Sequence, residues 1–261
     1  MKLLTFLQTY VEDGFLPLKV YAKAMETFQC SFREIEQIAL ENNITPLRYK
    51  RNQKTISVQE QYQLFNATVF ILGCGGLGGF VSEFLTRIGV GNLILMDGDI
   101  FEEHNLNRQN FSSIKALGSS KSAVVKSALE AINPAVHITS IPSFFELDKH
   151  ASLLENADVV VDALDNPTLK ASLASHCKRH NQAFVHAAIA GYSAQFCTSR
   201  LIDDLYMQEG DGAEKTYGNP SFTVAFAAAI QSTEVIKLLL NKPHLDVPLR
   251  ADLWEYEFNL L

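Results

Sequence analysis

A glycine-rich segment at residues 69–99 constrains the fold more than any other part of the chain. A short apolar run typical of a β-strand comes first, and Gly73, Gly75 and Gly78 follow it as a G-x-G-x-x-G turn. A helical pattern and a second apolar run come next. Asp97 closes the second run, about 20 residues after the last glycine of the turn. This order predicts a strand–turn–helix–strand unit.

The glycines of this turn suit the binding of a nucleotide phosphate. The first permits a tight turn, the second lets the backbone approach a phosphate, and the third lets helix and strand pack closely. The helix N-terminus offers N–H groups and a partial positive charge. An acid at this distance can bind a ribose hydroxyl. The segment therefore predicts a nucleotide site, and the alternative is a glycine-rich turn that serves packing alone.

The rest of the chain predicts an α/β fold. Strand-like and helix-like segments alternate through its middle part, which predicts a doubly wound, Rossmann-like parallel sheet. Beyond residue 191 the pattern changes. Extended segments at 192–202 and 251–261 predict antiparallel strands toward the C-terminus, with a long helix at 221–240 between them. The polar segment 203–217 predicts a surface loop.

The first 47 residues are expected to form a separate helical unit. Ser31 and Glu34 have the spacing of a capping box, and an apolar stripe follows them. This part has no glycine-rich turn and no paired acids. We expect two parts, an N-terminal helical appendage over residues 1–47 and a nucleotide-binding domain over residues 48–261.

Composition narrows the partners and the compartment. The net charge of −7 argues against nucleic acid as a main partner. The apolar run at the N-terminus is interrupted by Glu12 and Asp13, so we expect no signal peptide, and we expect no membrane-spanning segment. The four cysteines form no C-x-x-C pair, which argues against a zinc site built from paired cysteines. Free thiols without a signal peptide favour the cytoplasm.

Polar residues cluster after the predicted strands, at the sheet edge where open α/β folds bind ligands. The loop at residues 100–110 carries Asn105, Arg108 and Gln109. Lys121 lies in the first turn of a predicted helix, where a cation opposes the helix dipole, and this conflict points to a bound phosphate. Asp165 follows another buried strand and can face the same ligand.

Five motifs occur here in one order: G-C-G-G-L-G, L-M-D-G-D, N-L-N-R-Q, I-N-P and D-A-L-D-N, with a lysine opening the helix before I-N-P. In this combination the chain resembles the ThiF/MoeB/HesA family, the bacterial relatives of ubiquitin-activating enzymes. The resemblance runs from about Arg48 to the end and makes residues 48–261 an ATP-binding adenylation domain. Members adenylate the C-terminal glycine of a small ubiquitin-like sulfur carrier, using ATP and magnesium.

The resemblance implies a role for the glycine turn and its neighbours. Gly73, Gly75, Gly76 and Gly78 would hold the nucleotide phosphates, and Asp97 would bind the ribose. Two more residues belong to the same motifs and are expected in the nucleotide site, namely Asp99 and Gln109.

The resemblance also implies the catalytic residues. Asn105, Arg108 and Lys121 would contact the phosphates, and Asp165 would hold magnesium. Arg51 matches an arginine that reaches into the other subunit's site in family dimers, so the resemblance implies a homodimer. A carboxylate that attacks the α-phosphate of ATP brings two anions together, and fixed cations with a metal lower that barrier. The products would be an acyl-adenylate and pyrophosphate.

The sequence also departs from the family pattern. Many members carry two C-x-x-C pairs for structural zinc, and this chain has neither, so no structural zinc is expected. The segment 203–217 lacks the cysteine that many members use in sulfur transfer. Cys197 and Cys74 are expected to be packing residues, which leaves a covalent step on this protein without support. Lys170 lies where a basic residue often follows the D-N pair, and is expected to participate weakly.

Other functions remain open at this point. The glycine turn and Asp97 alone would permit a nicotinamide-dependent oxidoreductase, although no Tyr-x-x-x-Lys pair accompanies them. The same adenylating site could serve a peptide or a modified tRNA base, and the acidic net charge weighs against tRNA. A binding-only relative is a further alternative. The sequence does not identify the carrier, a small protein ending in Gly-Gly. It also does not say whether the sulfur ends in thiamine, molybdopterin, methionine or another product.

Overall fold

The computed structural model describes residues 2–198 and 214–261. Its centre is a sheet with the strand order β10-β9-β8-β7-β6-β3-β4-β5. The strands from β3 to β7 pair in parallel, as the alternating pattern predicts. Their bounds are Thr68–Leu72 (β3), Asn92–Met96 (β4), His137–Ile141 (β5), Val159–Asp162 (β6) and Phe184–Ala190 (β7).

The last three strands are antiparallel. They are Ser193–Thr198 (β8), Leu249–Asp252 (β9) and Glu257–Leu260 (β10). The prediction of a single strand over residues 251–261 is wrong, because β9 and β10 form a hairpin. The turn between them holds Tyr256 in the left-handed region, with φ of 57°. The aromatic residues at this end resemble a buried strand in sequence but lie largely exposed.

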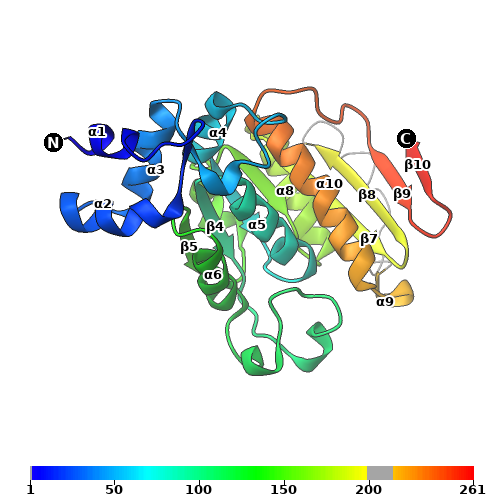
Figure 1. Ribbon diagram of the computed structural model, residues 1–261. Helices are drawn as coiled ribbons and strands as arrows, with labels where there is room; N and C mark the ends of the chain where they lie inside the picture. The colour runs from blue at the N-terminus through cyan, green and yellow to red at the C-terminus, as the bar shows by residue number, and fades with distance from the viewer. Residues whose placement is uncertain (1, 199–213) are drawn as a thin grey trace.

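Helices cover both faces of the sheet in a three-layer arrangement (Figure 1). One face carries Gly76–Ile88 (α5), Lys121–Ile132 (α6) and Ser221–Leu239 (α10), and the other carries Leu147–Leu154 (α7) and Pro167–Arg179 (α8). The helix α10 alone, among the described residues, is long and apolar enough to cross a membrane. Its packing against α5 and β7 accounts for that apolar character, since buried helices need apolar residues on more than one side.

The predicted loop at residues 203–217 is described only in its last part. Residues 203–213 lie outside the described residues, and Glu214–Tyr217 form the short helix α9 rather than loop. Gly218, Asn219 and Pro220 separate α9 from α10, and Pro220 is the N-cap of α10.

The N-terminal helices gather at one end of the molecule (Figure 1). They are Leu3–Gln8 (α1), Tyr21–Phe28 (α2) and Phe32–Glu41 (α3), and they share a hydrophobic cluster of their own. The predicted capping box of Ser31 and Glu34 begins α3. A short parallel pair, Phe15–Leu16 (β1) and Thr45–Pro46 (β2), adds strand to a region predicted as helical. The boundary at residues 47 and 48 stays a prediction.

One arginine fastens α3 to the sheet domain. Nη1 of Arg33 donates to the backbone oxygens of Gly91 (2.6 Å) and Ala135 (2.8 Å), and Nη2 donates to Oδ1 of Asn92 (3.2 Å). The helix Val58–Asn66 (α4) then leads the chain into β3. The N-terminal unit therefore packs where β4 and β5 begin, at the opposite end of these strands from the carboxyl ends where ligands bind.

The sheet has a topological switch point between β3 and β6. The chain leaves β3 toward β4 on one side and leaves β6 toward β7 on the other. In open α/β sheets such a point opens a crevice at the carboxyl ends of the two strands, which is where ligands bind. The glycine turn follows β3, and the D-A-L-D-N motif includes the end of β6, so both predicted motifs meet at this crevice.

Candidate active site

A cavity of 190 Å³ lies at the switch point. Its walls come from the glycine turn, the end of β4, the loop at residues 108–109, the start of α6 and the end of β6. The predicted residues that line it are Gly73, Gly75, Gly76, Asp97, Asp99, Arg108, Gln109, Lys121 and Asp165. A second cavity of 190 Å³ adjoins it and shares five of these, Asp99, Arg108, Gln109, Lys121 and Asp165, while adding Asn105.

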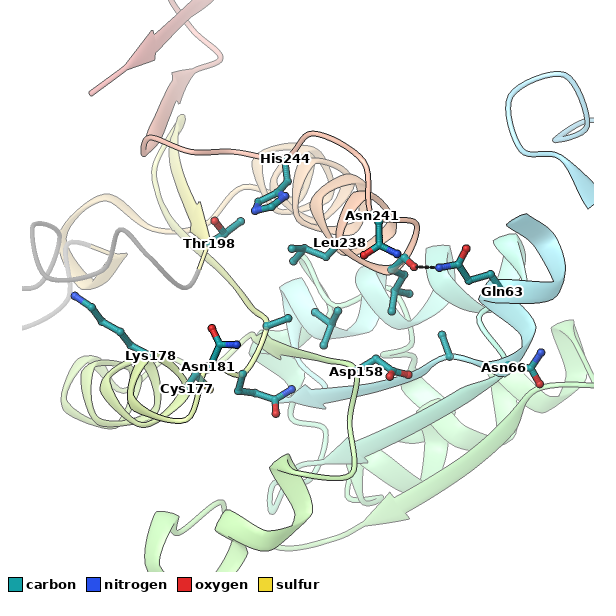
Figure 2. A pocket seen from close by; sticks show the side chains of 15 residues that line it. Gln63, Asn66, Asp158, Cys177, Lys178, Asn181, Thr198, Leu238, Asn241 and His244 are labelled. Atoms are coloured by element: carbon teal, nitrogen blue, oxygen red, sulfur yellow. Dashed lines mark hydrogen bonds between the residues drawn. The ribbon is translucent and has the colours of Figure 1, made fainter. Parts of the chain in front are cut away.

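A larger cavity, of 730 Å³, lies where the parallel strands begin, at the opposite end of the strands from the switch-point crevice. Figure 2 shows the side chains that line it. This cavity contains none of the predicted site residues. Several of its polar side chains already bond to the backbone: Gln63 donates to Leu239 O (2.6 Å), and Asp158 accepts from Thr68 N (2.7 Å). The candidate site therefore lies in the two adjoining cavities at the switch point, because the phosphate-binding turn and the convergent charges are there.

The glycine turn is held in place from two sides. Gly73 has φ of 95°, and a Cβ there would lie 2.5 Å from the backbone oxygen of Ala163, so this position requires glycine. The amide N–H of Cys74 donates to Oδ2 of Asp97 (2.6 Å), and the amide of Asp99 donates to Oδ1 (2.8 Å). Burial raises the pKa of Asp97, against the opposing effect of these hydrogen bonds. The Asp97 carboxylate thus fixes the turn as well as facing the cavity.

The N-terminus of α5 opens onto the cavity. Gly75 is its N-cap and has no side chain to bond the first amides. The side chain of Gln109 packs against Gly75, where a Cβ would lie 3.3 Å from Nε2. A Cβ on Gly78 would overlap the backbone oxygen of Gly73, so the third glycine lets helix and turn touch. Amides at a helix start that lack a side-chain cap are suited to a phosphate.

Lys121 is the first residue of α6 and is only 7% exposed. Its Nζ lies 3.0 Å from Oδ2 of Asp99, and its backbone amide donates to the Asp99 oxygen (2.9 Å). The acid therefore holds the lysine at a position where the helix dipole disfavours a cation. An incoming phosphate would meet a fixed positive charge rather than a mobile one.

The loop after β4 presents Arg108 to both cavities. Its Nη1 donates to His104 O (3.1 Å) and to Oδ1 of Asn107 (2.8 Å). Asn105 is buried, and its Oδ1 accepts from the amide of Glu102 (2.9 Å) at the start of a 3-10 turn, Glu103–Asn105. The predicted phosphate contact from Asn105 therefore comes from a side chain that also stabilises its own loop.

Asp165 follows β6 and lines both cavities. No group of three or more His, Cys, Asp or Glu side chains that could hold a metal occurs among the described residues. Mg²⁺ at nucleotide sites usually takes one or two carboxylates together with phosphate oxygens and water. One carboxylate beside a phosphate-binding turn fits that pattern.

Arg51 lies outside this site. It is exposed, in a turn just after the 3-10 helix Leu47–Tyr49, and the ring of Tyr49 packs against Gly89 at the C-terminus of α5. The cavity is at the N-terminus of the same 13-residue helix, which spans about 20 Å. The Arg51 side chain therefore does not meet the other predicted residues within one chain.

Two buried polar atoms in the cavity lack a partner in the part of the chain that the structure describes, and one of them belongs to Asn219, to which the sequence analysis assigned no role. Oε1 of Gln109 and Oδ1 of Asn219 are buried without a hydrogen-bond partner among the residues that the structure describes. Both residues line the cavity, and buried polar atoms are normally paired. Phe144 and Phe145, which follow β5, also line it. Their position after a parallel strand was the available signal, and the sequence analysis assigned them no role.

Comparison with known proteins agrees with this geometry. Residues 49–260 match the ThiF family. The chain is 30% identical over 228 residues to the heterocyst protein HesA of Trichormus variabilis, covering 83% of this chain and 85% of that protein. It is 30% identical over 206 residues to the molybdopterin-synthase adenylyltransferase of Haemophilus influenzae, covering 75% and 84%. The crystal structure of MccB from E. coli with ATP aligns with a TM-score of 0.70 and 25% identity, covering 92% of this chain and 81% of that one.

The fold is a doubly wound α/β fold, and the relatives place the chain among the adenylyltransferases of that class. The chain belongs to the ThiF family. The predicted family, fold class and adenylyltransferase class are confirmed by these relatives, which include named adenylyltransferases.

Proposed function

We propose that this protein uses ATP to adenylate the C-terminal glycine of a small ubiquitin-like sulfur-carrier protein, releasing pyrophosphate and leaving an acyl-adenylate for sulfur transfer. The observation that carries the proposal is the convergence of Arg108, Lys121 and Asp165 on a cavity floored by the glycine turn. A hydride-transfer enzyme has no evident need for two cations and a carboxylate around the phosphates.

The chain's own residues supply positioning and charge. The glycine turn and the N-terminal amides of α5 bind phosphate oxygens, and Asp97 accepts from a ribose hydroxyl with lone pairs left by its two backbone bonds. Arg108 and Lys121 balance the charge that develops when the acceptor carboxylate meets the α-phosphate. Asp165 would hold Mg²⁺, which when bound neutralises phosphate charge. Neither Cys74 nor Cys197 is needed, and both are buried.

An exposed aromatic surface beside the cavity supports a protein acceptor over a small molecule. Tyr192, in the β7–β8 turn, stacks on Phe222 of α10 at 6.0 Å and packs on Trp254 of the β9–β10 turn at 4.7 Å. Phe222 and Trp254 are 56% and 66% exposed. Exposed apolar patches commonly mark protein-binding surfaces. The patch is close to the cavity along the chain, because Ile189 and Asn219 line the cavity. Tyr192 follows Ile189 by three residues, and Phe222 follows Asn219 by three residues.

The remoteness of Arg51 supports a homodimer in which each chain completes its partner's site. A groove of 490 Å³ between α5 and α10 lies close to Arg51 in sequence, since Thr55 and Ile56 form one wall. Apolar side chains of both helices, among them Ile88 and Ile236, line much of the rest. A dimer through this face would cover the groove and carry Arg51 across. We propose a homodimer on these grounds, and a cytoplasmic location because the four cysteines are free thiols.

ATP–pyrophosphate exchange tests the proposal. Purified protein is assayed with and without small carriers that end in Gly-Gly. We expect exchange that requires one carrier and is abolished by Arg108→Ala and by Asp165→Ala. It should survive in Lys126→Ala, a change at a half-buried lysine of α6 that lines neither cavity. Full activity in Arg108→Ala or Asp165→Ala would remove that residue from the mechanism.

Mixing two inactive variants tests the dimer. If Arg51 acts in the partner's site, Arg51→Ala and Arg108→Ala should be inactive alone and regain about one quarter of wild-type activity when remixed at random. The reason is that half of the dimers would then contain one complete site. No recovery from a mixture shown to exchange subunits would contradict a role for Arg51 in trans.

The second candidate is a peptide acceptor at the same site. The aromatic patch suits a peptide as well as a folded carrier, and this reading predicts ATP binding with no exchange for any Gly-Gly carrier. A tRNA acceptor is disfavoured by the net charge of −7. Binding of NADH but not of ATP would revive the oxidoreductase reading and overturn the proposal.

A further inference from the structure

A buried charged cluster is built around Asp162, the first residue of the D-A-L-D-N motif. Asp162 ends β6 with no exposed surface, and its Oδ2 lies 3.1 Å from Nζ of Lys170 on α8 and 2.6 Å from Nδ1 of His186 on β7. Nζ of Lys170 also donates to the backbone oxygen of Ala187 (3.2 Å). The three side chains come from three elements that meet at the switch point.

The cluster is arranged around an ionised carboxylate. Burial opposes ionisation, but Lys170 and His186 together lower the pKa of Asp162. Burial and the nearby Lys170 lower the pKa of His186, so the imidazole is neutral. Because an ionised carboxylate can only accept, the Nδ1 atom that faces Asp162 carries the imidazole proton. Lys170 thus supplies the charge that makes a buried Asp162 tolerable.

The other oxygen of the same carboxylate fixes the backbone that leads to Asp165. Oδ1 of Asp162 accepts from the amide of Leu164 (3.1 Å). The amide of Ala163 donates to Leu72 O on β3 (2.9 Å), and the side chain of Gln231 donates to the Asp162 backbone oxygen (2.8 Å). The segment from 163 to 165 therefore leaves the sheet in one direction, with Ala163 against the glycine turn.

The helix that follows closes the same segment from its other end. Asn166 is the N-cap of α8 and accepts from the amide of Leu169 (3.0 Å). Lys170, at the end of the first turn of that helix, ties the helix back to Asp162. Asp165 is thus the residue between two anchored points, and its direction into the cavity depends on the Asp162–Lys170 pair.

We propose that Asp162, Lys170 and His186 are positioning residues, which hold the Asp165 carboxylate where it can bind the Mg²⁺ that accompanies ATP. This inference rests on the ATP and metal roles assigned under the proposed function. Lys170 then acts through Asp165 and never touches a phosphate itself, consistent with its absence from the residues that line the two cavities.

The test measures ATP binding with saturating Mg²⁺ and again with a chelator, and takes the ratio of the two affinities as the metal-dependent gain. Loss of residues that orient a metal ligand typically lowers metal affinity about 10–100-fold. We expect Lys170→Met to lose at least about tenfold of the gain on that basis, while its affinity in chelator stays at the wild-type value. Lys170→Gln, which keeps a donor for Asp162 without the charge, should lose a similar share and covers the case in which the methionine variant does not fold.

Two controls separate positioning from general destabilisation. Lys170→Arg keeps the charge and should retain most of the gain. Leu173→Ala removes a fully buried side chain one turn along the same helix, so it should lower stability and leave the metal-dependent gain intact. Lys170 variants with the wild-type gain, or Leu173→Ala with an equal loss, would overturn this inference alone. Wild-type ATP binding with no metal-dependent gain would overturn it together with the metal role of Asp165.

Discussion

Replacing Gly73 by alanine should lower the free energy of unfolding of the protein through two separable effects. The first is conformational, because φ at this position is 95°, and an L-residue in the left-handed region is disfavoured by about 1–2 kcal/mol. The second is steric, because the new Cβ would lie 2.5 Å from the backbone oxygen of Ala163 and 3.0 Å from its carbon. Both neighbours are backbone atoms, so β6 or the turn must move.

Gly118 provides the matched control for this change. Its φ is 80°, and a Cβ added there would meet no atom within 4 Å. Gly118→Ala should therefore show the conformational effect alone, about 1–2 kcal/mol. Gly73→Ala should add the overlap with Ala163, about 1–3 kcal/mol for a strained close contact. The difference between the two variants estimates how firmly the turn is pressed against the end of β6.

Chemical denaturation with urea measures these stabilities, and a thermal scan gives a second reading at about 2–4 °C per kcal/mol for a protein of this size class. ATP affinity is measured in parallel. We expect Gly118→Ala to bind ATP as the wild type does and Gly73→Ala to lose binding, because its turn cannot keep its position. Equal losses of stability in the two variants, with ATP binding preserved in both, would refute the argument that Ala163 and the glycine turn form one rigid unit.

Two further predictions concern buried groups outside the cavity. Burial raises the pKa of Glu36 to about 7, although Arg48 pairs with it, so the carboxyl binds its proton more tightly in the folded than in the unfolded chain. The stabilisation from this proton is lost as pH rises from about 4.5 to about 7. Over that window the free energy of unfolding of a Glu36→Gln variant, measured in urea, should rise by about 3 kcal/mol relative to that of the wild type. Parallel pH profiles of the two proteins would contradict this. Burial raises the pKa of both Cys177 and Cys197 to about 12 and that of Cys74 well above its usual range. These three thiols should therefore resist a thiol reagent until the chain unfolds. Rapid labelling of any of them in the folded protein would contradict their packing.

The sequence predicts the parallel half of the sheet well because its signals are local. Most strands there are short apolar runs between a helix and a turn, β5 alternates polar and apolar residues, and the glycine motif marks the first strand. The same local reasoning fails at residues 251–261. There the aromatic side chains of Trp254, Tyr256 and Phe258 resemble a buried strand, but they belong to an exposed surface and a hairpin turn. Aromatic character alone does not distinguish a core strand from a binding surface.

The sequence predicts most of the residues that line the candidate cavity, but not Asn219, Phe144 or Phe145 and not the contacts that support the site. Lys121 and Asp165 are found from their positions after strands and at a helix start. Nothing in the sequence indicates that His186, a single histidine in an apolar run, lies opposite Asp162 on the neighbouring strand. The strand order that makes them neighbours is a tertiary property. Asn219, whose Oδ1 has no partner among the described residues, is missed for the same reason, since it comes from a distant part of the chain.

The switch point also has a consequence for the order in which the protein folds. β6 pairs with β3 across a long stretch of chain: Thr68 bonds to Asp158, 90 residues away. The units that contain β3, β4 and β5 close over shorter distances, and the entropic penalty of closing a chain segment grows with its length. The wall that carries Asp165 is thus expected to join last, so a newly synthesised chain would acquire its nucleotide affinity only when most of the sheet is already folded. Bound ATP would then mainly lower the rate of unfolding and change the rate of folding little.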